Sequence, residues 1–136
     1  MPKKSKNSKK SRSNAINPKR LIYPWGCEEW FCLNMKCTIK LLEVRPKQML
    51  SLQFHHKRDE FWKIMTGEIE VIVGNIRKKA KAGEEFWIKR GTIHRIIGGK
   101  KKSEILEISL GHFDENDIER IEDKYKRNRR GAGMKK

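Results

Sequence analysis

The chain has 136 residues, with 33 Lys and Arg against 17 Asp and Glu, which gives a net charge of +16 at pH 7. This length suits one domain with a packed core and is too short for two ordinary ones. No apolar stretch reaches the roughly 18 residues of a membrane span, and no apolar segment follows the basic N-terminus as it does in a secretory signal. We therefore expect no membrane association, and we expect the three cysteines to be free thiols in a reducing, cytoplasmic compartment.

The positive charge is concentrated in the two ends of the chain. Residues 1–20 contain eight Lys or Arg and residues 124–136 contain seven, without any acidic residue, whereas residues 21–123 hold 18 basic and 17 acidic residues. This composition predicts disordered basic tails over 1–20 and 128–136 around one domain over 21–127. Such tails either contact nucleic acid or another polyanion weakly, through counterion release, or are solvated ends without a partner.

Short apolar runs follow one another along the body of the chain. After an irregular segment or short edge strand over 21–32, runs rich in Ile, Val, Phe and Trp recur at about ten-residue spacing with glycines between them. They are CTIKLLEV, MLSLQFH, EFWKIMTG, EIEVIVGN, EEFWIK, HRIIGG and SEILEISLG. In the fourth run, Ile69, Val71 and Val73 share one face of a strand. This pattern predicts an all-β antiparallel sandwich or barrel.

One short helix is predicted at the end of the body, over residues 114–125. In the sequence DENDIERIEDKY, Ile118, Ile121 and Tyr125 lie at i, i+3 and i+7, which forms one apolar stripe on a helix. Asp114 is a suitable N-cap, and acidic residues in the first turn match the helix dipole.

Polar residues near the ends of three predicted strands indicate a candidate metal site. Gln53 and His55 point to one face of a strand, and the adjacent His56 points to the other. Glu60 opens the next strand, and His94 follows a glycine-containing turn. Two imidazoles, a carboxylate and an amide suit a divalent ion such as Zn, Co, Ni, Fe or Mn. On spacing alone, it remains open whether His55 and His94 are unrelated polar residues on strands.

The arrangement of these residues resembles the two paired motifs of the cupins, a family of small jelly-roll (double-stranded β-helix) barrels. The matching pattern is Gln53-x-His55-x4-Glu60-x6-Gly67, then Gly83-x7-Gly91-x2-His94. Cupins usually have His at the position of Gln53. The run LSLQFHHKRDEFW instead resembles the isomerase domain of type II phosphomannose isomerases, which is commonly fused to a mannose-1-phosphate guanylyltransferase domain. YPWG at 23–26 and DENDIERIEDKYKR at 114–127 resemble the opening and closing motifs of that domain.

The resemblance implies a metal-dependent isomerase that interconverts mannose 6-phosphate and fructose 6-phosphate for GDP-mannose metabolism. The implied ligands of the divalent ion are Gln53, His55, Glu60 and His94. Arg58 matches a family arginine implicated in isomerisation and is the catalytic candidate, unless it is a surface residue of a charged turn. The candidates for binding the sugar phosphate are Lys57, Arg120 and Tyr125, and the general base is not identified. No Gly-rich nucleotide-binding start is present, so nucleotidyl transfer is not expected.

Two other functions remain open. The chain is either a related cupin that acts on, or only binds, another sugar phosphate or sugar nucleotide, or a basic nucleic-acid-binding module on a cupin scaffold. A homodimer is a further expectation, because dimers are common among cupins. The sequence does not select the metal.

Overall fold

The computed structural model describes residues 16–127, which form eleven β-strands and no helix. Accordingly, no helix in this range could cross a membrane. The described chain separates into two compact units that divide between Cys37 and Thr38. Most of the predicted N-terminal tail (1–15) and the predicted C-terminal tail (128–136) lie outside the described residues, whereas residues 16–20 are described and contain the start of the first strand.

The first unit contains a β-hairpin. β1 (Lys19–Tyr23) pairs antiparallel with β2 (Gly26–Trp30) around a two-residue turn. The aromatic rings of Tyr23 and Trp25 stack at this turn, with their centroids 5.2 Å apart. The cysteines of this unit are free thiols, as predicted: Cys27, Cys32 and Cys37.

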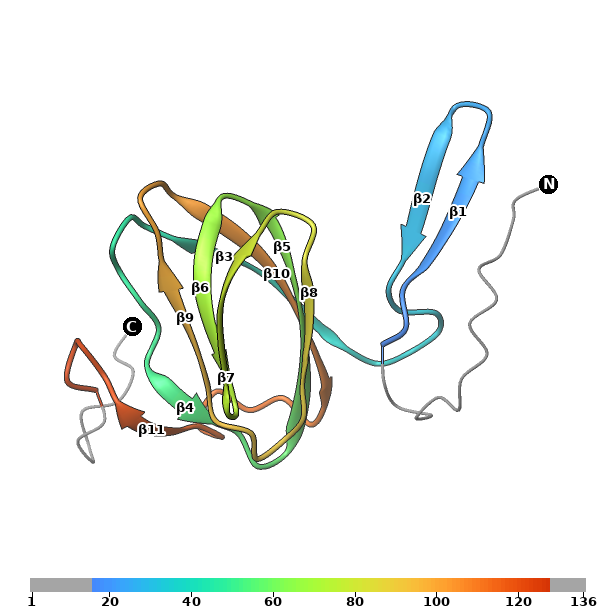
Figure 1. Cartoon of the computed structure of the whole chain (residues 1–136). Coiled ribbons are helices and arrows are strands. Elements are labelled where there is room, and N and C mark those ends of the chain that lie inside the picture. Colours follow the sequence, from blue (N-terminus) through green and yellow to red (C-terminus); the bar gives the residue numbers. More distant parts are fainter. Residues whose placement is uncertain (1–15, 128–136) are drawn as a thin grey trace. The chain divides into compact units, whose positions relative to one another are not determined.

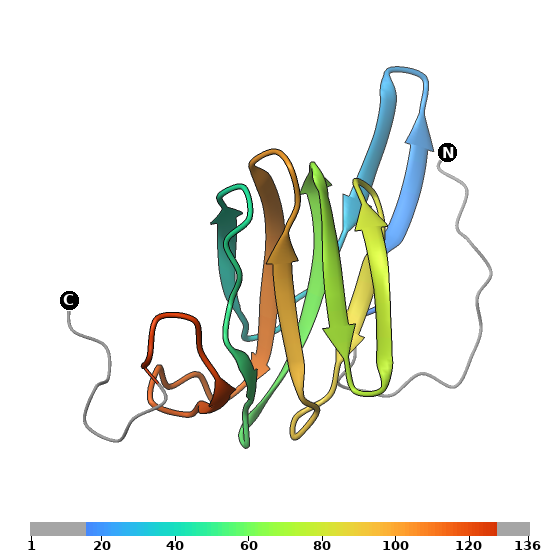
Figure 2. The same cartoon turned by 60° about the vertical axis from the view of Figure 1, so that its left-hand side comes forward.

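The second unit consists of two antiparallel sheets that face each other (Figures 1 and 2). The first sheet has four strands, in the order β3 (Thr38–Val44), β10 (Ser103–Gly111), β5 (Arg58–Thr66) and β8 (Glu85–Ile88). The second has five, in the order β11 (Glu119–Glu122), β4 (Leu52–Phe54), β9 (His94–Gly98), β6 (Glu68–Val73) and β7 (Ile76–Lys81). All seven apolar runs of the sequence form strands of this barrel.

The hydrophobic core lies between the two sheets. Alternate residues of each strand point inward, so the predicted face of β6 is confirmed: Ile69 and Val71 are buried, and Val73 packs against them. The other buried members of the core are Val44, Trp62, Ile64, Ala80, Ile88, Ile96 and Ile105. This packing stabilises the barrel by removing large apolar side chains from water.

Inward positions change from apolar to polar along β5 and β10. Ile64 and Ile105 are cross-strand neighbours in the core, and the next inward pair consists of Trp62 and Glu107. Beyond these, Glu60 is 2% exposed and lies near the beginning of β5. The polar residues therefore gather towards the end of the barrel where β5 begins, which is the lower end in Figure 1.

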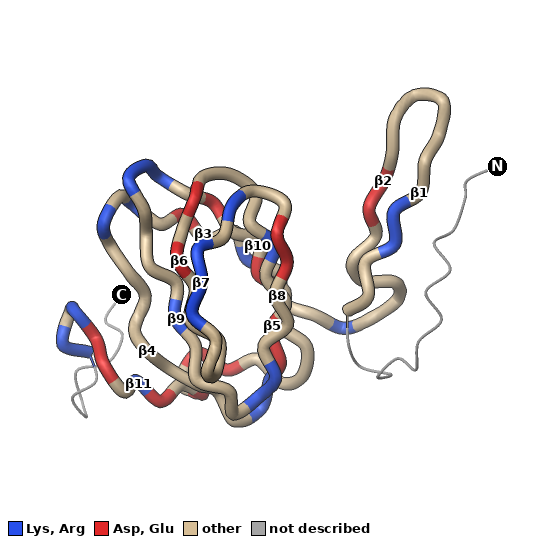
Figure 3. The backbone as a smooth tube through the Cα atoms, in the orientation of Figure 1, with Lys and Arg blue, Asp and Glu red and all other residues tan. Residues whose placement is uncertain are grey.

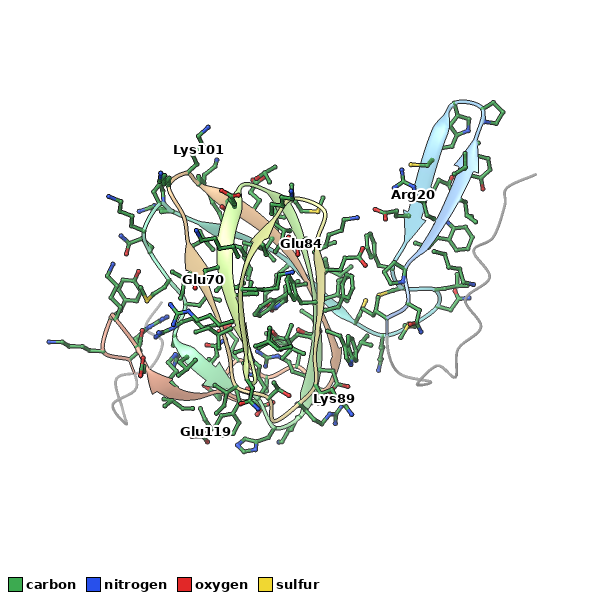
Figure 4. The ribbon with its side chains drawn as sticks, viewed as in Figure 1. Arg20, Glu70, Glu84, Lys89, Lys101 and Glu119 are labelled. Carbon is green, nitrogen blue, oxygen red and sulfur yellow. The ribbon has the colours of Figure 1, made fainter. Side chains whose placement is uncertain are left out.

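Ion pairs occupy the outer surface beside β7, a basic edge strand that was not among the predicted strands. Arg77 Nε lies 2.7 Å from Glu70 Oε2, and Lys78 Nζ lies 2.8 Å from Glu84 Oε1. Figure 3 shows the basic course of β7, and Figure 4 labels Glu70 and Glu84 beside it. These carboxylates offset part of the positive charge of the strand, although each exposed pair contributes only about 0–1 kcal/mol to stability.

The predicted C-terminal helix is wrong. Residues 114–117 form a turn in which Asp114 Oδ1 accepts a hydrogen bond from the Asn116 backbone N–H, and the strand β11 follows. β11 pairs with β4, so its backbone groups are satisfied by a sheet instead of a helix. The apolar spacing of residues 118–125 is therefore compatible with a helix, but the available sheet edge determines the structure.

Candidate metal centre and adjoining cavity

Neighbouring strands bring the four predicted metal ligands together. Gln53 on β4 is the cross-strand partner of His94, the first residue of β9. His55 follows β4 directly, and Glu60 points inward from β5. All four lie at the end of the barrel where β4 ends and β5 and β9 begin.

Three of these residues form a compact buried cluster. His55 Nε2 lies 3.1 Å from Glu60 Oε2, and His94 Nε2 lies 3.6 Å from Glu60 Oε1. One ligand atom from each residue falls within 4.8 Å of the other two, and each residue is at most 2% exposed. Metal–ligand bonds of about 2.0–2.1 Å place two donors of a tetrahedral ion about 3.3 Å apart, so this donor set fits one divalent ion.

Hydrogen bonds behind the two imidazoles orient them. His55 Nδ1 lies 2.7 Å from the backbone carbonyl oxygen of Asp117, and His94 Nδ1 lies 2.8 Å from that of Thr92. A carbonyl oxygen only accepts, so each Nδ1 carries a proton and donates it. Nε2 is then the nitrogen of each ring that faces Glu60 and that would bind an ion, an arrangement typical of metal-binding histidines.

The charge states of the cluster also suit a cation. Burial lowers the pKa of His94, so its imidazole is neutral at pH 7. Burial acts to raise the pKa of Glu60, but its contacts with the His55 and His94 rings and the charge of the Arg58 guanidinium outweigh it and bring the pKa to about 2. The cluster therefore presents an ionised carboxylate beside two imidazole rings.

Gln53 is held beside His94 by Ser51. The Ser51 hydroxyl donates to Gln53 Oε1 at 2.6 Å, and Gln53 Nε2 lies 3.5 Å from His94 Nε2. For the amide oxygen to bind a metal ion, the amide group has to turn over, after which its nitrogen donates to the Ser51 hydroxyl instead. Gln53 therefore fits as an oxygen ligand with its other amide atom still satisfied.

Arg58 is buried against the cluster and is not a surface residue of a charged turn. Its Nε donates to Glu60 Oε2 at 3.2 Å, and its Nη2 lies 3.3 Å from His55 Nε2. The guanidinium also lies over the Phe113 ring, 4.6 Å from its centroid, and donates to the Asp114 carbonyl oxygen. His55 Nε2 has a single lone pair, which an ion needs, so metal binding requires Arg58 Nη2 to release it, whereas the Glu60 carboxylate can bind an ion and keep its hydrogen bond with Arg58.

A cavity of about 270 Å³ adjoins the cluster. It is lined by Lys40, Leu42, Leu50, Gln53, His55, Arg58, Glu60, Glu107, Phe113, Glu115, Ile118 and Arg120. This volume is in the range of a small, polar ligand. The cavity thus places two arginines, a lysine and carboxylates around one small volume.

Glu107 and Lys40 were not predicted to belong to the site. Glu107 is 5% exposed, and burial together with the nearby Glu60 charge raises its pKa to about 7. Lys40 Nζ lies 3.8 Å from Glu107 Oε2. In the run SEILEISLG, Glu107 alternates with its neighbours in the same way as Ile105 and Ser109, so all three point to the inward face of the strand. An acidic residue on this inward face is the sequence signal that could have identified Glu107.

The three predicted sugar-phosphate-binding residues differ in position. Arg120 lines the cavity, opposite Gln53 in the sheet. Lys57 has an exposed side chain and does not line it. Tyr125 lines a different, larger cavity of about 640 Å³ and donates a hydrogen bond to Gln48 Oε1.

His56 points away from the cluster, as strand parity predicts. Its side chain is 58% exposed, and its Nε2 lies 3.6 Å from Glu119 Oε2. Figure 4 labels Glu119 on the outer surface at the lower end of the barrel.

The two-sheet barrel and the His–Glu–His cluster at one of its ends define the class of the protein, a cupin barrel, as predicted from the sequence. The structure is similar to a cupin 2 conserved barrel domain protein from Salinispora arenicola, with a TM-score of 0.51 and 20% identity over 71% of this chain and 76% of the other. It is also similar to a sugar phosphate isomerase of the cupin superfamily from Silicibacter pomeroyi, with a TM-score of 0.52 and 16% identity over 57% of this chain and 52% of the other. At these identities the likeness establishes the fold.

The family is given by the sequence comparison. Residues 10–123 match the model of the mannose-6-phosphate isomerase C-terminal domain, and the chain belongs to that family, which confirms the resemblance. It is 33% identical over 118 residues to the xanthan biosynthesis protein XanB of Xanthomonas campestris (85% of this chain, 25% of the relative). It is 32% identical over 118 residues to the alginate biosynthesis protein AlgA of Pseudomonas aeruginosa (85% and 24%). The chain therefore spans about a quarter of the length of these relatives.

Proposed function

We propose that the protein is a metal-dependent aldose–ketose isomerase that interconverts mannose 6-phosphate and fructose 6-phosphate. The observation that carries this proposal is the convergence of His55 Nε2, His94 Nε2 and the Glu60 carboxylate beside a cavity with two arginines. Membership of the isomerase domain family supports the choice of a sugar phosphate.

The proposed ligands are Gln53, His55, Glu60 and His94, with Zn, Co, Mn, Ni or Fe as suitable ions. A divalent ion held by these residues would supply a Lewis acid that polarises the sugar carbonyl. The surrounding strands hold the four side chains in place before the substrate arrives, which reduces the reorganisation that accompanies the reaction.

Arg58 is the proposed catalytic cation. A guanidinium offers N–H donors and no acceptor, so Arg58 can stabilise negative charge and does not serve as a base. Because Arg58 Nη2 must release His55 Nε2 when a metal ion binds, that N–H donor would become available to an enediolate oxygen of the substrate in the cavity.

Arg120 is the proposed phosphate-binding residue. Its Nε is buried and has no hydrogen-bond partner among residues 16–127, and burial lowers the pKa of its guanidinium. An unpaired buried donor costs about 1–3 kcal/mol, which an anionic ligand in the cavity offsets. Lys57 and Tyr125 remain weaker predictions for this role, because their side chains lie outside the lining of the cavity.

The alternative proposal is a cupin that acts on another sugar phosphate or sugar nucleotide. The larger cavity beside Tyr125 favours it, because its lining meets that of the smaller cavity at Leu50. A nucleic-acid-binding module is less well supported, because the 18 basic residues over 21–123 are nearly balanced by 17 acidic ones.

A coupled assay tests the leading proposal. Metal-loaded full-length protein should convert mannose 6-phosphate, and a chelator should abolish the activity. His94→Ala should lose both bound metal and turnover, whereas His56→Ala, the exposed control, should keep both. Absence of turnover by metal-loaded protein refutes the isomerase proposal, and turnover of a sugar nucleotide instead supports the alternative.

The cytoplasmic location, a homodimer and weak polyanion contact through the basic tails belong to the same proposal. Deletion of residues 1–15, which leaves the strand β1 intact, tests the polyanion contact: activity should survive, while retention on a polyanion column should fall.

A further inference from the structure

Glu107 is a buried acid that the proposed metal site and phosphate site do not use. It lies on β10 with an exposed fraction of 5%, and its side chain lines the cavity. Buried carboxylates in proteins are normally satisfied by several hydrogen bonds or by a close ion pair. The contacts of the Glu107 carboxylate therefore indicate whether this residue serves only to stabilise the fold.

The carboxylate of Glu107 is weakly partnered. Within residues 16–127 its one charged contact is Lys40 Nζ at 3.8 Å, and none of the side-chain hydrogen bonds found there involves it. Lys40 itself is shared with the Phe113 ring, whose centroid lies 4.5 Å from Nζ. A contact of 3.8 Å is longer than a hydrogen bond, so the lone pairs of the carboxylate remain available to a ligand in the cavity.

Glu107 also lies close to the candidate metal ligands without being one of them. On the adjacent strand, Glu60 pairs with Ser109 and Trp62 pairs with Glu107, so the two acids are one inward position apart. Both line the same cavity. A small ligand in this cavity therefore has Glu107 and two of the candidate metal ligands, His55 and Glu60, within the same lining.

The other polar residues of the cavity lack the properties of a base. Arg58 and Arg120 remain protonated, and Glu60 is a proposed metal ligand. The Glu115 side chain is exposed. Among the described lining residues, this leaves Glu107 as the buried carboxylate that is free to exchange a proton with a substrate.

We propose that Glu107 is the acid–base residue that carries the proton between C2 and C1 of the sugar, an inference that rests on the proposed isomerase function. Its carboxylate removes the proton from C2 of the open-chain aldose. The electron pair of that C–H bond forms the C1=C2 bond, and the carbonyl pair moves to O1. After a proton passes from O2 to O1, the carboxylic acid of Glu107 returns its proton to C1, and the electron pair on O2 forms the ketose carbonyl.

The surroundings of the carboxylate agree with this role. It is buried in the lining of the cavity, and Lys40 Nζ, at 3.8 Å, leaves its oxygens free to exchange a proton with a substrate.

Substitution Glu107→Gln tests the proposal, because the amide has the same shape and cannot accept the proton. We expect kcat to fall by about 10²–10⁴-fold, with bound metal, measured by elemental analysis, unchanged. Glu107→Asp should restore part of the turnover. Glu104→Gln, on the opposite face of β10, is the matched control and should behave like the wild type.

Isotope transfer provides a measurement on the wild type that does not depend on how the variants fold. With mannose 6-phosphate deuterated at C2, a single shielded carboxylate should deliver part of the label to C1 of fructose 6-phosphate. Product without any deuterium at C1, or wild-type turnover by Glu107→Gln, overturns the role of Glu107 alone. Loss of bound metal in Glu107→Gln would assign it a structural role and also overturn the proposal. An inactive wild-type protein would remove the isomerase function, and the role of Glu107 with it.

Discussion

Asp117 lies in the turn that precedes β11 and connects it to the turn between His55 and Arg58, and its replacement by Asn provides the most direct test of that connection. Asp117 Oδ1 accepts a hydrogen bond from the His56 backbone N–H at 2.8 Å, and Oδ2 accepts one from the Lys57 backbone N–H at 2.9 Å. The backbone carbonyl of Asp117 also accepts the proton of His55 Nδ1. One residue therefore holds the turn between His55 and Arg58.

The expected loss of stability in Asp117→Asn follows from which of these hydrogen bonds an amide can still accept. In Asp117→Asn one oxygen remains an acceptor, and the other position becomes an NH₂ group that faces a backbone N–H. A hydrogen bond to a charged group contributes about 1.5–3 kcal/mol, so we expect the free energy of unfolding to fall by about that amount. The His55 contact is made by the backbone, so it should persist.

The pH dependence has a defined sign. Burial acts to raise the pKa of Asp117, but the His56 and Lys57 N–H groups and nearby positive charges outweigh it, so the pKa lies below its ordinary value of 3.8. A pKa that is lower in the folded state stabilises the protein above the ordinary value. That contribution is lost as the pH falls from about 4 through the folded pKa, and Asp117→Asn should lack this part of the acid destabilisation.

Urea unfolding at pH 7 and at pH 3 measures both effects. Asp114→Asn is the matched control, because the half-buried Asp114 side chain caps a turn with one oxygen that Asn also provides. It should change stability by less than about 0.5 kcal/mol. If Asp117→Asn is as stable as the wild type at pH 7, the two N–H groups do not depend on the carboxylate, and the reasoning is refuted.

Three other predictions concern the fold, the cavity and the metal. Gly67→Ala should destabilise the protein by about 2–5 kcal/mol, because the new Cβ lies 2.9 Å from Ser103 Cα at a φ of +90°. Gly83→Ala, at a φ of +96° with open space around the new Cβ, should cost about 1–2 kcal/mol, measured by calorimetry. Equal losses of stability in the two variants would contradict the predicted clash with Ser103. Arg120→Ala should raise KM for mannose 6-phosphate about 10–100-fold, whereas Arg77→Ala on the outer surface should leave KM unchanged. An unchanged KM in Arg120→Ala argues against phosphate binding by Arg120. Dialysis against a chelator should lower the midpoint of unfolding, and added Zn²⁺ should restore it. The free energy of unfolding should fall by about 4 kcal/mol if the free ion had been at about 1,000 times its Kd. An unchanged midpoint means that no ion binds the native state.

Alternation along single strands made most of the barrel predictable. The inward face of β6 followed from the spacing of Ile69, Val71 and Val73, and the same parity separated His55 from His56. β7 was not predictable in this way, because its exposed edge carries basic residues that have no apolar period. The segment over 114–125 was predicted as a helix because its apolar spacing suits one, and the open edge of β4 overrides that spacing.

The sequence by itself determined the strand runs of the barrel, the family and the candidate ligands, because these depend on local spacing and on motifs that lie within a few residues of one another. Only the tertiary structure decided that Arg58 is buried against the cluster, that Arg120 lines the cavity and that Tyr125 lines another one. It also identified Glu107, whose raised pKa depends on burial and on a carboxylate from a different strand. Burial and charge proximity arise from contacts between residues that are distant in the chain, so the order of the residues alone does not express them.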